Sequence, residues 1–136
     1  MLGVSKKKNN HGKSAKVLVA EDDPVGRNLI KLVLKTMKIE DVTFATDGLS
    51  AWQEIEKSEK AFDLIISDWN MPIATGLELL EQIRDEDMNT PFLMVTGRGL
   101  VESAVEAKMM GVTAFIPKPY SPQQMMRKIG EIISLK

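Results

Sequence analysis

Apolar and polar stretches alternate regularly along the chain from residue 17 onward. Short apolar runs rich in β-branched residues, typical of strands, cover residues 17–20, 42–45, 64–66, 92–95 and 114–116. Each run leads into a segment in which apolar residues recur at helical spacing. Because the runs do not alternate with polar residues, they indicate strands that are covered on both faces.

Five helices are predicted between and after these strands. Pro24 occupies a first helical position, where a missing N–H costs nothing, and Asp47 caps a second helix. A third helix follows the loop 70–75, a fourth covers about 100–110, and the fifth starts at residues 121–122. This alternation of strands and helices predicts a doubly wound α/β domain with a parallel sheet.

A basic segment precedes the regular pattern. Residues 1–16 hold five lysines and no acid, whereas the remaining residues carry a net charge of −6. The segment has too few apolar residues to offset the entropy of ordering it. We therefore predict a disordered basic tail over residues 1–15 and one domain over residues 16–136. The acidic body argues against nucleic-acid binding.

The residue types exclude several kinds of chemistry. The 136 residues contain no cysteine, and His11 is the single histidine, so thiol catalysis, disulfides and multi-histidine metal sites are excluded. Any metal must be a hard cation held by oxygen atoms. No signal peptide and no apolar run of membrane-spanning length is present, so we expect a cytoplasmic protein without membrane association.

Polar residues follow four of the five predicted strands, where the strands end. They are Asp22, Asp23, Asp68, Thr96 and Lys118. The carboxyl ends of parallel strands share one edge of the sheet, so these side chains should converge. Three converging carboxylates need a cation, and oxygen ligands favour Mg²⁺ or Mn²⁺. Lysine and threonine suit phosphoryl oxygens, which predicts a Mg²⁺-dependent phosphoryl site with a carboxylate nucleophile.

Four segments carry a resemblance to a known family. They are Val-Leu-Val-Ala-Glu-Asp-Asp (17–23), Ile-Ile-Ser-Asp-Trp-Asn-Met-Pro (65–72), Met-Val-Thr-Gly (94–97) and Phe-Ile-Pro-Lys-Pro-Tyr (115–120). The sequence resembles response-regulator receiver domains of two-component signalling, especially stand-alone chemotaxis receivers of the CheY type. The resemblance runs from about Lys16 to the end. It implies a flavodoxin-like sheet with strand order 2-1-3-4-5 and five helices.

The resemblance also implies roles for the residues at the strand ends. Asp68 would accept a phosphoryl group from a sensor histidine kinase. Asp23 and Asp68 would bind Mg²⁺ directly, together with the backbone carbonyl of Asn70, and Asp22 would act through water. Lys118 would pair with a phosphoryl oxygen.

Further residues would control the response to phosphorylation. Thr96 would bind another phosphoryl oxygen, Phe115 would be the aromatic switch, and a cis peptide bond before Pro119 would aim the lysine. Positions two residues beyond the phosphoacceptor and the threonine tune hydrolysis in the family. In this chain they are Asn70 and Arg98.

We expect the signal to leave through contact with another protein, since the chain ends after the fifth predicted helix. The face formed by the fourth helix, fifth strand and fifth helix changes on phosphorylation in this family. Its candidate contacts are Val101, Ala104, Lys108 and Phe115. A flagellar switch component is the expected target of a monomeric regulator. The protein would be a phosphoacceptor with self-phosphorylation from small donors and autodephosphorylation, not an enzyme.

Other functions fit less well. A phosphorelay intermediate or a phosphate sink is the main alternative, and the sequence does not decide between it and chemotaxis. A haloacid-dehalogenase-type phosphatase would have a second aspartate at position 70, where this chain has Asn70. A flavodoxin-like electron carrier would need a phosphate loop after the first strand, where three acids stand instead.

Overall fold

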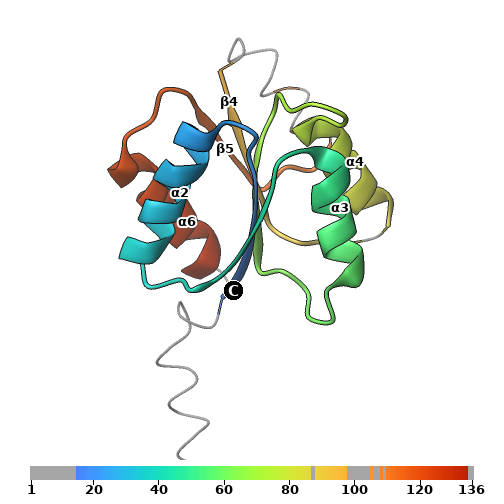
Figure 1. The fold of residues 1–136 in the computed structure, drawn as a ribbon, viewed down its shortest axis with the longest axis horizontal. Coiled ribbons are helices and arrows are strands. Elements are labelled where there is room, and N and C mark those ends of the chain that lie inside the picture. The colour runs from blue at the N-terminus through green and yellow to red at the C-terminus, as the bar shows by residue number, and fades with distance from the viewer. Residues whose placement is uncertain (1–14, 87, 98–104, 106–107, 109, 135–136) are drawn as a thin grey trace, which may run out of the picture.

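The computed structural model describes residues 15–86, 88–97, 105, 108 and 110–134 (Figure 1). Its elements in chain order are β1 (Lys16–Ala20), α2 (Pro24–Thr36), β2 (Asp41–Ala45), α3 (Gly48–Lys57), β3 (Leu64–Asp68), α4 (Gly76–Asp85), β4 (Phe92–Thr96), β5 (Ala114–Pro117) and α6 (Pro122–Ser134).

The predicted strands and four of the predicted helices are confirmed. The helix expected at about 100–110 lies mostly outside the described residues, although Val105 and Lys108 are helical. The predicted tail also lies outside them, except for Ala15. That residue is buried in the core.

The strands form one parallel sheet in the predicted order, β2-β1-β3-β4-β5. Ala20 of β1 pairs with Ser67 of β3, so the residues that follow β1 lie beside the end of β3. The chain passes from β1 to β2 on one side and then to β3 on the other. The space beyond the ends of β1 and β3 is therefore the topological switch point, where ligands bind in such sheets.

Helices cover both faces of the sheet (Figure 1). Helices α2 and α6 pack together on one face, and α3 and α4 pack together on the other. Successive side chains of β1 point to opposite faces of the sheet. Val17 and Val19 pack in the α2–α6 core, whereas Leu18 and Ala20 pack in the α3–α4 core. Within the described part of the chain, no helix is long and apolar enough to cross a membrane.

Candidate functional site

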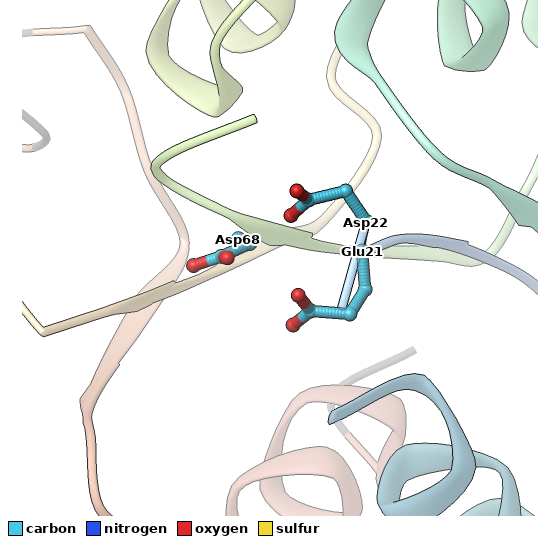
Figure 2. Close-up of side chains that lie close together, drawn as sticks. All are labelled: Glu21, Asp22 and Asp68. Atoms are coloured by element: carbon cyan, nitrogen blue, oxygen red, sulfur yellow. The ribbon is translucent and has the colours of Figure 1, made fainter. Parts of the chain in front are cut away.

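Three carboxylates converge at the carboxyl edge of the sheet (Figure 2). Glu21 and Asp22 follow β1, and Asp68 is the last residue of β3. One oxygen from each side chain lies within 4.8 Å of the others. Figure 2 shows all three carboxylates turned toward the same space. We refer to Glu21, Asp22 and Asp68 as the acidic cluster.

Glu21 is the buried member of the acidic cluster, with 1% of its surface exposed. Its Oε2 accepts a hydrogen bond from the backbone N–H of Asp23 at 3.2 Å, whereas its Oε1 has no hydrogen-bond partner. The side chain packs against Gly26 of α2, where an added Cβ would stand 3.1 Å from Cδ. Burial, reinforced by the negative charge of Asp68, raises the pKa of Glu21 to about 7.

Lys118 brings positive charge to the acidic cluster. Its Nζ lies 3.2 Å from Oδ2 of Asp68 and 3.8 Å from Oε1 of Glu21. Its backbone N–H donates to the carbonyl of Thr96 at 2.7 Å, which ties the end of β5 to the end of β4. The Lys118–Pro119 peptide bond is cis, as the resemblance implied. The structure thus brings the predicted lysine directly to the predicted nucleophile.

Asp23 does not belong to the acidic cluster, although it was predicted to bind the metal directly. It is the exposed N-cap of α2, and its carboxylate accepts hydrogen bonds from the backbone N–H groups of Val25 and Gly26, each at 3.4 Å. The carboxylate therefore satisfies the open helix end instead of facing Asp68. The group that takes its place beside Asp68 is Glu21.

The sequence itself indicates that Asp23 caps a helix. Pro24 at the first helical position marks Asp23 as the N-cap, a role that commits its carboxylate to the helix. The two acids between the buried strand and that cap, Glu21 and Asp22, then remain to reach the end of β3. Sequence reasoning named Asp22 and Asp23 for this place, whereas the structure brings Glu21 and Asp22 to the end of β3.

The other predicted site residues are placed as follows. Thr96 is buried at the end of β4, and Asn70 is exposed in the loop after β3. Phe115 is half-buried in β5 and packs against the α3–α4 core. Lys108 is exposed. The predicted residues Arg98, Val101 and Ala104 lie outside the described residues.

Tyr120 is a further side chain near the acidic cluster, and sequence reasoning did not single it out. It is half-buried and lines an open cavity of about 440 Å³ with Asp23, Gly26 and Lys118 among its neighbours. Burial raises the pKa of Tyr120 to about 12, and the charges of Glu21 and Asp68 add to this effect. Tyr120 therefore lies within the electrostatic field of the site.

The acidic cluster suits a hard divalent cation. Its donors are carboxylate oxygens, which favour Mg²⁺ or Mn²⁺ over softer metals. The buried Oε1 of Glu21 lacks a hydrogen bond, and such a group is costly unless it has a polar partner. A cation among the three side chains would give this oxygen a close polar partner and would reduce the mutual repulsion of the carboxylates.

Comparison with known proteins identifies the class of protein that carries this fold and site. Residues 17–130 match the response regulator receiver domain family. The chain therefore belongs to that family, whose members take part in two-component signalling as phosphoacceptors and not as classical enzymes.

Its relatives include chemotaxis regulators. The chain is 34% identical over 122 residues to chemotaxis protein CheY-3 of Vibrio cholerae, covering 88% of this chain and 92% of that protein. It is 35% identical over 120 residues to a chemotaxis protein CheY homolog of Campylobacter jejuni, covering 87% and 92%.

Solved structures agree with this relationship. The receiver domain of the Francisella response regulator 1452 superposes with a TM-score of 0.81 at 30% identity, covering 89% of this chain and 98% of that one. Chemotaxis response regulator CheY4 of Vibrio cholerae gives 0.78 at 33% identity, covering 87% and 98%.

Proposed function

We propose that Asp68 accepts a phosphoryl group in a Mg²⁺-dependent reaction and that the chain works as a single-domain response regulator in chemotaxis. The observation that carries this proposal is the meeting of the acidic cluster with Lys118, whose Nζ lies 3.2 Å from the Asp68 carboxylate. The chemotaxis names of two relatives that span most of the chain support the biological role.

The transfer places a phosphoryl group on a carboxylate oxygen of Asp68. That oxygen attacks phosphorus, an acyl phosphate O–P bond forms, and the P–N bond to the donor's histidine breaks. The imidazole nitrogen keeps the electron pair of the broken bond. The ammonium of Lys118 is close enough to Asp68 to pair with a phosphoryl oxygen once the acyl phosphate exists.

The acidic cluster would hold the cation. Glu21, Asp22 and Asp68 supply carboxylate oxygens, with the backbone carbonyl of Asn70 as a further ligand. Glu21 takes the part that the sequence assigned to Asp23. When bound, Mg²⁺ neutralises the charge on the phosphoryl oxygens during transfer.

The output would run through Thr96 and Phe115. Thr96 is the last residue of β4 and follows Val95, which pairs with Asp68, and Phe115 lies on the neighbouring strand β5. A new phosphoryl group would hydrogen-bond Thr96, and the half-buried Phe115 would shift with it to alter the surface around Lys108. A flagellar switch component is the proposed target of that surface.

Labelling with a small phosphodonor tests the proposal. Acetyl phosphate with Mg²⁺ should add one phosphoryl group to the wild-type chain, as measured by intact mass spectrometry. Asp68→Asn should abolish the adduct because it removes the anionic nucleophile while keeping the shape. Asp63→Asn is the matched control, since Asp63 is a half-buried aspartate at the opposite end of β3. An adduct that persists in Asp68→Asn and disappears in Asp63→Asn contradicts the assignment.

A further inference from the structure

The loop between β3 and α4 contains a turn with an unsuitable residue at its centre. The N–H of Ala74 donates to the carbonyl of Pro72, two residues earlier, at 2.7 Å, which closes a γ-turn around Ile73. Ile73 has φ 69°, in the left-handed region. A β-branched side chain is disfavoured there, and glycine or asparagine would be the ordinary choice.

Hydrogen bonds on both sides hold this turn in place. The N–H of Gly76 donates to the carbonyl of Trp69 at 2.8 Å, and the N–H of Gly48 donates to the carbonyl of Ala74 at 2.9 Å. A Cβ at Gly48 would stand 2.6 Å from that carbonyl oxygen, so the start of α3 lies directly against the turn. The surrounding structure therefore imposes the left-handed conformation on Ile73.

Ile73 gains nothing from burial that would offset this strain. Its side chain is 77% exposed, although isoleucine is among the residues most often buried. A second exposed apolar residue, Leu49, follows Gly48 and is 48% exposed. Leu49 therefore follows the residue that is hydrogen-bonded to the turn. Neither packing nor backbone geometry explains an isoleucine at this position.

We propose that Ile73 is a docking contact for the protein that donates the phosphoryl group, and that it fits an apolar surface beside the donor's phosphohistidine. The inference rests on the proposed function of Asp68. A histidine-bound phosphorus must approach Asp68 to bonding distance, so the donor covers the rim around that residue. The loop with Ile73 begins directly after Asp68 and returns to Trp69, which places the exposed isoleucine where a protein donor must arrive.

Two substitutions separate the apolar contact from the strain. Ile73→Met keeps an apolar side chain without β-branching, and Ile73→Asn places a polar residue that tolerates the left-handed region. Ile73→Asn should raise the Tm by about 4 °C, because asparagine tolerates the left-handed region, and Ile73→Met should raise it less, because it removes only the β-branching. Labelling by acetyl phosphate should be unchanged in both, because a small donor needs no docking surface.

Phosphotransfer from proteins is the deciding measurement. The probes are the purified histidine-containing domains of the sensor kinases encoded in the source organism, each phosphorylated with labelled ATP. The domain that transfers fastest to the wild-type chain is used for the comparison. Ile73→Asn should slow this transfer roughly tenfold, whereas Ile73→Met should stay within about twofold of wild type.

Equal transfer rates for the wild type and both variants would overturn the docking role. So would the failure of every kinase domain to label a wild-type chain that acetyl phosphate labels well. If acetyl phosphate itself fails to label the wild type at Asp68, the proposed function fails, and this outcome is distinct from both of the others.

Discussion

Glu21 and Asp23 are two acids that follow the same strand, only two residues apart, yet they have opposite surroundings. Glu21 is almost completely buried, with one oxygen that has no hydrogen-bond partner and a pKa raised to about 7. Asp23 is exposed, and its carboxylate accepts two backbone hydrogen bonds at the start of α2. Local structure, and not residue type, decides which acid faces Asp68.

The difference arises from where the strand ends and the helix begins. Pro24 fixes the first residue of α2, so Asp23 must cap the helix. Glu21 stays beside the end of β3, where Gly26 leaves room for its longer side chain. The glutamate is therefore the acid suited to a cation, and the aspartate is the acid suited to a helix end.

Cation affinity is where the two acids should differ most. Glu21→Gln should weaken Mg²⁺ binding by roughly tenfold to a hundredfold, because it removes a carboxylate from the acidic cluster. Asp23→Asn should change the Kd by less than about twofold. Fluorescence of Trp69, which is buried next to Asp68, reports binding in a Trp52→Phe background. Equal losses in the two variants would place Asp23 in the metal site after all.

Stability without divalent cations should shift in the direction set by the Glu21 pKa. The folded protein holds the proton of Glu21 more tightly than the unfolded chain does, because the pKa is raised in the folded state. The contribution of this protonated side chain to the free energy of unfolding is therefore complete below pH 4.5, the ordinary pKa. It is lost as the pH rises through about 7. Glu21→Gln should therefore raise the free energy of unfolding by about 2 kcal/mol at pH 8 and by much less at pH 4.5. Urea denaturation at both pH values measures this difference. A lower free energy of unfolding for Glu21→Gln at pH 8 would contradict a strained buried charge.

Substitution of Asp23 should lower the free energy of unfolding, whereas substitution of Glu21 should raise it. Asp23→Ala removes the cap of α2 and should lower the free energy of unfolding by about 1 kcal/mol. Asp23→Asn keeps a capping oxygen and should lower the free energy of unfolding by only about a few tenths of a kcal/mol. Chemical denaturation of the two variants makes the comparison. If alanine and asparagine are tolerated equally well, the cap contributes nothing.

The smallest expected effect concerns Tyr120, the single tyrosine of the chain. Its pKa of about 12 means that stability is lost as the pH rises from about 10 through 12. Glu21→Gln should lower the pKa of Tyr120 only partly, because burial is the larger cause and remains. Asp23→Asn should leave it unchanged. Tyrosinate absorbance follows the titration, and an ordinary pKa near 10 in the wild type would contradict the burial.

Much of the fold could be predicted because its signals are local. Buried parallel strands read as uninterrupted apolar runs, so β1 to β5 were visible directly, and their ends located Asp68, Thr96 and Lys118. The convergence of these residues follows from the parallel topology alone. Sequence patterning therefore predicted the edge of the sheet at which the site lies.

The rest depended on contacts that no local pattern encodes. Which acids after β1 lie beside Asp68 depends on where α2 begins, and Pro24 and its cap Asp23 set that point. The left-handed turn at Ile73 is held in place by a contact with another element, because the N–H of Gly48 at the start of α3 donates to the carbonyl of Ala74. The raised pKa of Tyr120 likewise comes from burial and from the charges of Glu21 and Asp68, which are distant in sequence.

A crystal structure with Mn²⁺ and the phosphoryl analogue beryllofluoride tests the central claim most directly. Anomalous scattering should locate one Mn²⁺ at the acidic cluster, among the carboxylates of Glu21, Asp22 and Asp68. The beryllofluoride should be bonded to Asp68 and contact Lys118. A cation held by Asp23, or an analogue bonded to any other carboxylate, would contradict the account.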